Sequence, residues 1–182
     1  VAVDAKAASL AGFHGPLMVA GFFGVVISLE RAVAAARLWA YAAPLACGLA
    51  GIAIFVGEPS FAAGLATLGA AILAFASFRF VAMQPEAHTM TIAAGAVALA
   101  AGNLAWYATG QPSAAVPAWA AFLVLTIAGE RLELSRFLPR STPVRATFVA
   151  IAVAIGMSAV LASDPRGARA FGAALLALAG WL

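Results

Sequence analysis

Long runs of apolar residues dominate this sequence, and charged residues fall almost entirely in the gaps between the runs. About 20 consecutive apolar residues cross the hydrocarbon core of a bilayer, and residues 10–29 supply such a run. Hydrophobic residues make up 65% of the chain and charged residues 9%, against about 25% charged in an ordinary soluble domain. A water-soluble fold cannot bury this much apolar surface. The sequence therefore predicts an integral membrane protein.

The apolar runs predict helices and not the strands of a transmembrane barrel. Barrel strands alternate apolar and polar residues, whereas Ala62–Ala76 is apolar on every face. Gly, Pro and polar residues punctuate the gaps. We expect an all-α, polytopic transmembrane helical bundle of about seven helices, which are Leu10–Arg31, Tyr41–Val56, Phe61–Ala82, Glu86–Tyr107, Val116–Phe137, Val144–Ala162 and Arg166–Leu182. They form a single domain over residues 1–182, which we expect to continue beyond Leu182 because the last run is short for a full span.

Two similar segments indicate an internal repeat. Residues 22–31 read FFGVVISLER and residues 122–131 read FLVLTIAGER, so Phe, Ile, Glu and Arg coincide at a constant offset. An even number of membrane crossings separates the copies, which makes them parallel in topology. We therefore consider a parallel internal repeat of four helices, with chance similarity between apolar segments as the alternative.

The basic residues predict the orientation in the membrane. Lys and Arg concentrate in cytoplasmic loops, and seven of the ten fall on one predicted side of the bundle. These seven are Arg31, Arg37, Arg79, Arg131, Arg136, Arg140 and Arg145. Lys6, Arg166 and Arg169 fall on the other side. We expect a multi-pass protein of a bacterial inner membrane with its amino terminus outside.

The most informative charges are two Glu-Arg pairs, Glu30 with Arg31 and Glu130 with Arg131, each at the end of a long apolar run. An ionisable residue at membrane depth costs several kcal/mol unless it is paired or hydrated. The two pairs therefore predict one shared charge network. It serves either as a proton or cation entry point or, on the alternative interpretation, as an interfacial ion-pair cluster that fixes helix register.

His14 is a candidate metal ligand. It lies among Gly12, Gly15 and Pro16, whose small side chains leave room for a flat cofactor. Met18 follows one helical turn later, and imidazole and thioether are ligands of both copper and haem iron. The alternative is a histidine with a packing or interfacial role. Pro16 either kinks the first span near His14 or marks the first turn of its helix.

His88 is a second candidate cofactor ligand, at the start of a predicted helix on the other side of the membrane from His14. The two histidines are then about a bilayer thickness apart and do not share one metal. Either His88 serves a separate cofactor near its own face, or it meets water and headgroups at the interface.

Two of these segments resemble histidine-bearing helices of the NnrS-type membrane proteins. The segments are HGPLMVAGFFGVVI, beginning at His14, and HTMTIAAG, beginning at His88. The resemblance covers about 22 residues and implies a polytopic protein that binds haem and copper and is linked to nitric-oxide stress. It implies His14 and His88 as ligands. The family's fuller pattern has a second histidine near the first and about twelve spans, which this sequence does not contain.

Three functions follow from these features. The first is a haem- or copper-binding membrane protein with a redox or nitric-oxide role, and the second is an accessory or scaffold subunit that packs against other membrane subunits. The third is a small-solute or ion transporter that uses the Glu-Arg pairs. The lipid bilayer is the expected partner and nucleic acid is not, because the basic residues are spread over several loops. Phosphate-binding loops, paired-cysteine zinc patterns and nucleophile elbows do not occur in the sequence.

Overall fold

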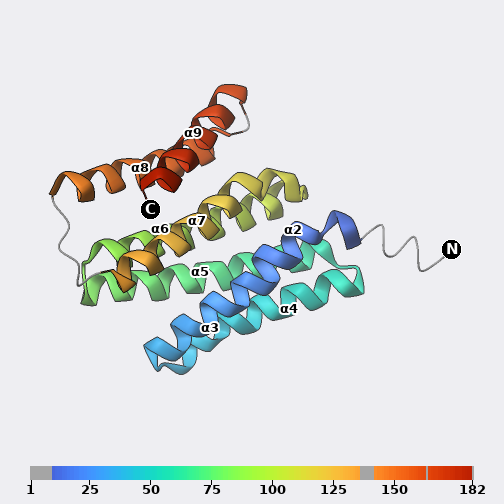
Figure 1. Cartoon of the computed structure of the whole chain (residues 1–182). Helices are drawn as coiled ribbons and strands as arrows, with labels where there is room; N and C mark the ends of the chain where they lie inside the picture. Colours follow the sequence, from blue (N-terminus) through green and yellow to red (C-terminus); the bar gives the residue numbers. More distant parts are fainter. Residues whose placement is uncertain (1–9, 136–141, 163, 182) are drawn as a thin grey trace.

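The computed structural model describes residues 10–135, 142–162 and 164–181, and within these residues it contains helices and no strand. The prediction of an all-α bundle is therefore confirmed (Figure 1). The elements are α2 (His14–Pro16), η1 (Leu17–Phe23), α3 (Gly24–Ala35), η2 (Leu38–Tyr41), α4 (Ala42–Val56), α5 (Pro59–Met83), α6 (Ala87–Thr109), η3 (Pro112–Ala115), α7 (Val116–Leu134), α8 (Thr142–Val160) and α9 (Pro165–Trp181).

Five stretches of the described chain are long and apolar enough to cross a membrane. They are His14–Ala35, Leu38–Val56, Pro59–Met83, Ala87–Thr109 and Pro112–Leu134. The protein is a helical membrane protein. The last two predicted helices correspond to α8 and α9, which pack on each other as a hairpin and lie beside α6 and α7 (Figure 1). The predicted end points Phe137 and Leu182 lie outside the described residues.

Glycine and proline set the helix ends, as the sequence predicts. Gly57 ends α4 with φ of 90° and Gly110 ends α6 with φ of 68°, a left-handed conformation that glycine adopts without steric cost. Pro59 occupies the first turn of α5, where its missing N–H would have no intrahelical partner. These short turns make successive helices antiparallel neighbours, with α5 packed against α4 and α6.

The first span is interrupted where the sequence places Pro16. It begins as α2, continues for seven residues as the π-helix η1, and returns to α-helical geometry in α3. The N–H of Gly24 donates to the carbonyl of Val19, one residue further back than in an α-helix. Pro16 therefore lies within the helical span beside an altered hydrogen-bond pattern, and Ala20 in η1 reaches the core.

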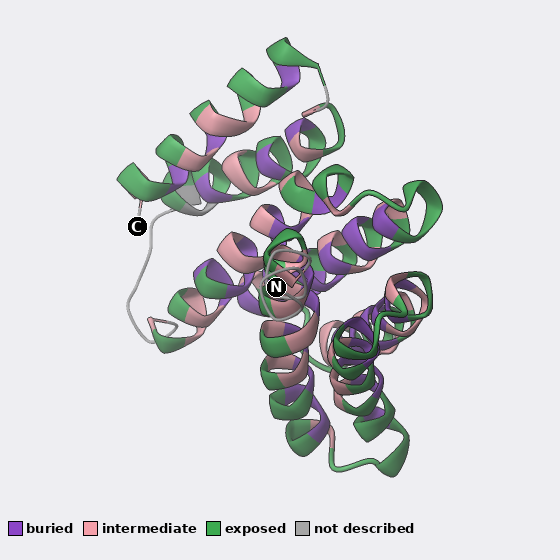
Figure 2. Cartoon of the chain, turned by 90° about the vertical axis from the view of Figure 1, so that its right-hand side faces the viewer, coloured by how far each residue is buried: buried purple, intermediate pink, exposed green. Residues whose placement is uncertain are grey.

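Small residues allow the helices of the bundle to approach closely. Large apolar side chains point outward and alanines inward, so the outer faces in Figure 2 are exposed and the inner faces buried. A Cβ added at Gly69 of α5 would lie 2.6 Å from the Sγ of Cys47 in α4. Such close packing drives helix association in lipid, where the hydrophobic effect between helices is absent.

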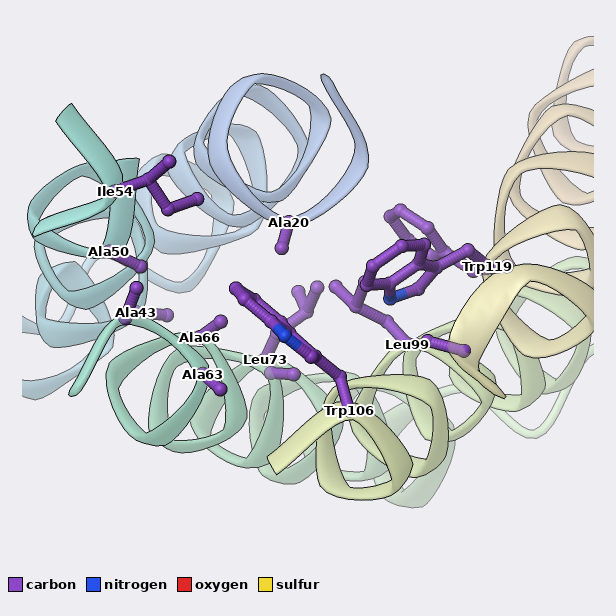
Figure 3. Close-up of a cluster of buried hydrophobic side chains, with 14 of the residues drawn as sticks. Ala20, Ala43, Ala50, Ile54, Ala63, Ala66, Leu73, Leu99, Trp106 and Trp119 are labelled. Atoms are coloured by element: carbon purple, nitrogen blue, oxygen red, sulfur yellow. The ribbon is translucent and has the colours of Figure 1, made fainter. Parts of the chain in front are cut away.

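Two tryptophans fill the space between the alanine-rich helices. Trp106 of α6 and Trp119 of α7 are 1% and 2% exposed and meet edge to face, with ring centroids 6.1 Å apart. Figure 3 shows both indoles in the same buried cluster as Leu99 and Ala66. The core thus lies between α5, α6 and α7, with the first span and α4 packed on one side.

Candidate functional site

A charged cluster joins the first span to α7 at one end of the bundle. The Nη2 of Arg31 in α3 lies 2.5 Å from the Oε1 of Glu130 in α7 and 3.4 Å from the Oε1 of Glu30. The Arg31 side chain is 11% exposed, against 39% for Glu130 and 57% for Glu30. The guanidinium Cζ also lies 5.9 Å from the ring centroid of Phe80 in α5. Arg31 is therefore a buried cation held by two partly exposed carboxylates.

The structure thus brings together three of the four residues of the predicted charge network. Arg131, the fourth, is exposed. Because Arg31 contacts Glu130, the similar segments 22–31 and 122–131 have their C-terminal ends on the same side of the bundle. Parallel copies of a repeat have this arrangement. Arg136, which could extend the cluster, lies outside the described residues.

The surroundings of Arg31 are closely packed. Its side chain lies among Ser77, Phe80, Thr89 and Ile92, and the gap between them has no room for a water molecule. The Nε of Arg31 is buried and has no hydrogen-bond partner within the described part of the chain. The cluster has the features of an interhelical ion pair.

His88 lies in the first turn of α6, on the wall of a large apolar groove. The N-terminus of α6 is fixed by Glu86 and Thr89, whose side chains form a capping box. His88 is 6% exposed as a residue and lines the groove, but its ring nitrogens are not among the fully buried polar atoms without a partner, which in the described residues are Arg31 Nε and Thr126 Oγ1. An imidazole in the wall of an apolar groove is a group that a ligand in the groove can contact.

The groove runs between α6 and α8, with α7 as its floor, and has a volume of about 1280 Å³. Ala94, Ala98, Ala101 and Ala105 line it from α6. The opposite wall consists of apolar residues of α8, among them Val149, Val153 and Met157. Trp181 of α9 lies near the His88 end, where its ring packs 4.7 Å from that of Phe148. Ligand pockets commonly combine such apolar walls with one or a few polar groups.

His14 and Met18 occupy a different environment from His88. His14 is exposed at the start of the first span, and Met18 in η1 is 37% exposed. A Cβ added at Gly12 would meet nothing within 4 Å, whereas one added at Gly15 would lie 3.3 Å from the Trp119 ring. Within the described residues, no three His, Cys, Asp or Glu side chains cluster in a way that could hold a metal ion. The structure leaves His14 and His88 at opposite ends of the bundle (Figure 1).

Sequence reasoning missed the groove and the buried amide site. The Nδ2 of Asn103 donates to the carbonyl of Ala66, 2.9 Å away, and its Oδ1 accepts from the Nε1 of Trp119 at 2.8 Å. Asn103 is fully buried, and its partners show that it joins α5, α6 and α7. The available signal was a lone Asn in an apolar helix, which commonly bonds across helices. The groove left only a weaker signal, the four-residue spacing of alanines in α6.

The fold and the site define a polytopic helical membrane protein with a buried interhelical ion pair and an apolar groove beside α6. More specifically, the chain belongs to the family described as "Domain of unknown function (DUF8744)", whose sequence profile covers residues 1–182. Neither the curated proteins nor the solved structures contain a match to this chain.

Proposed function

We propose that this protein binds haem in the groove beside α6, with His88 as an axial ligand, and that it has a redox or nitric-oxide-related role. The observation that carries the proposal is the position of His88, a 6% exposed residue, in the wall of a large apolar groove. Histidine is the commonest axial ligand of haem iron. The resemblance of the His88 segment to NnrS-type proteins agrees with this role.

Haem suits this groove better than a bare copper ion does. The porphyrin supplies four of the iron ligands itself, so the protein needs to add only an axial group and apolar walls. The groove has about 1280 Å³, above the 300–1,000 Å³ typical of small-molecule pockets, and its walls are apolar. When bound, the haem iron would supply electron transfer or the binding of a small gas molecule. A copper ion at His14 and Met18 would need further ligands from elsewhere, because both side chains face outward.

The test is optical titration of the detergent-purified protein with haem. We expect a Soret band that shifts on binding to the wild type and is lost, or shifts to that of free haem, in His88→Ala. His14→Ala is the matched control and should bind haem as the wild type does. A wild type that leaves the haem spectrum unchanged would refute the proposal, and so would an unaltered band in His88→Ala.

In this proposal the charge network has a structural role. Arg31 and Glu130 are in direct contact, and the gap among the surrounding side chains is too small for water. This geometry favours an ion pair that holds the helices together over the ion path of a transporter. A role as an accessory subunit is compatible with haem binding, and its partners would be other membrane subunits.

We further propose that the protein lies in a bacterial inner membrane with its amino terminus outside. The support is the excess of Arg in the loops at the Arg31 end of the bundle. In a Cys47→Ala background, single cysteines at Gln111 and Arg37 separate the two orientations. An impermeant maleimide applied to spheroplasts should label the cysteine at position 111 and not the one at position 37, and the reverse result would contradict the proposal.

A further inference from the structure

The turn between α3 and α4 brings an arginine and a tryptophan beside the end of α5. α3 ends at Ala36, whose φ of 49° and ψ of 40° are left-handed and change the direction of the chain. Arg37 follows in an extended conformation, and η2 places the ring of Trp39 edge to face with that of Phe75 in α5, with ring centroids 5.3 Å apart. Arg79 comes four residues after Phe75 and therefore on the same face of α5. Two arginines thus lie next to the Trp39–Phe75 contact, at one end of the bundle (Figure 1).

Arg37 and Arg79 have no carboxylate partner in the described part of the chain. Both residues are exposed. The ion pairs among the described residues join Arg31 to Glu30 and Glu130, so these two carboxylates already serve another guanidinium. A guanidinium matches the geometry of a phosphate and binds it through two parallel hydrogen bonds. The two arginines are therefore free to bind a phosphate from outside the protein.

These residues lie at the depth where the apolar spans end. Arg37 immediately precedes the span Leu38–Val56, and Arg79 is about 6 Å, at 1.5 Å per residue, from the end of the span Pro59–Met83. Leu38 is 92% exposed and Trp39 39% exposed, so apolar and basic side chains share this surface. Tryptophan concentrates at the membrane–water interface, and arginine near the end of a span extends its charged group to the same level. The surface therefore meets the headgroups of the bilayer.

We propose that Arg37 and Arg79 bind the phosphate of one anionic phospholipid, with the ring of Trp39 against the glycerol part of the lipid. A zwitterionic headgroup carries a cation beside its phosphate, which two guanidiniums without counter-charges repel. Phosphatidylglycerol carries no such cation. Each basic residue near an anionic membrane surface contributes about fivefold in affinity, so two predict a preference of about 30-fold. The proposal goes beyond haem binding and does not depend on it.

Arg131 provides the internal comparison. It is exposed, and it lies at the same end of the bundle because the preceding residue, Glu130, contacts Arg31. Arg131 belongs to α7, and both Glu130 and Glu133 are near it in the sequence. The local field of these carboxylates opposes the binding of an anion. Exposure and positive charge alone therefore do not define the site of Arg37, Trp39 and Arg79.

The first experiment measures lipid binding to the detergent-purified, delipidated protein by native mass spectrometry. The wild type should bind phosphatidylglycerol about 30-fold more tightly than phosphatidylcholine. Arg37→Gln combined with Arg79→Gln should remove most of this preference, whereas the matched control Arg131→Gln should retain it. Equal affinity of the wild type for the two lipids overturns the proposal. An unchanged preference in the double variant, or an equal loss in Arg131→Gln, does the same.

A second experiment follows Trp39 itself and does not depend on the folding of the arginine variants. The protein is placed in bilayers of equal parts phosphatidylglycerol and phosphatidylcholine, in which one of the two lipids carries bromine atoms, a fluorescence quencher, in its acyl chains. Trp39 is one of four tryptophans, so the difference between the wild type and Trp39→Phe isolates its fluorescence. Brominated phosphatidylglycerol should quench this signal more than brominated phosphatidylcholine does. Equal quenching by the two lipids overturns the proposal.

Discussion

Removing the charge of Glu130 tests whether the Arg31 ion pair holds the first span on α7. Glu130→Gln keeps the shape of the side chain and leaves Arg31, which is 11% exposed, with Glu30 at 3.4 Å as its remaining carboxylate. Breaking a fully buried pair costs about 3–5 kcal/mol, and an exposed pair contributes about 0.2–1 kcal/mol. Glu130 is itself 39% exposed and therefore partly screened by its surroundings. We expect a loss of about 1–3 kcal/mol in the free energy of unfolding.

The assay is reversible unfolding in mixed micelles of mild detergent and SDS, followed by the fluorescence of the four tryptophans. Glu133→Gln is the matched control, because it removes a carboxylate one turn further along α7 and should change stability by less than about 0.5 kcal/mol. Arg31→Gln combined with Glu130→Gln completes a double-mutant cycle and should show favourable coupling. Additive losses, or equal losses in Glu130→Gln and Glu133→Gln, would refute the interpretation.

Two further substitutions test the packing of the bundle, both by thermal unfolding in detergent. Asn103→Leu removes the acceptor of the Trp119 indole N–H and should cost about 1 kcal/mol, so unchanged stability would show that the buried amide contributes nothing. Gly69→Ala would bring a methyl group to 2.6 Å from the Sγ of Cys47. We expect a loss of about 1–3 kcal/mol from such overpacking. Gly51→Ala meets nothing within 4 Å and should not destabilise, so similar losses in both variants would contradict the packing argument.

The positions of the helices could be predicted because their causes are local. Phe61–Ala82 was predicted and α5 covers Pro59–Met83, while Glu86–Tyr107 was predicted and α6 covers Ala87–Thr109. Apolar length and the proline and glycine residues at the gaps determine both helices, and these signals are read from neighbouring residues. The π-helical segment after Pro16 could not be predicted in detail, because a proline alone does not determine the backbone hydrogen-bond pattern of the turns that follow it.

The partners of the site residues could be predicted only in part. Two Glu-Arg pairs at membrane depth indicated a shared network, but which Glu meets Arg31 depends on how α3 and α7 approach each other in the folded bundle. His14 and His88 look equivalent in the sequence, yet one is exposed and the other lies in a groove wall. That difference arises from the position of the α8–α9 hairpin, which no local pattern in α6 specifies.

The ion pair between Arg31 and Glu130 also constrains the order in which the helices can pack during synthesis. The ribosome delivers Arg31 to the membrane before the 99 residues that lead to Glu130 have been made. Until that acidic partner emerges, the guanidinium of the nascent first span can pair with the neighbouring carboxylate of Glu30. The first span therefore cannot complete its final docking on α7 before the fifth span has entered the bilayer, and chains truncated ahead of α7 retain an Arg31 that lacks the closer of its two carboxylates.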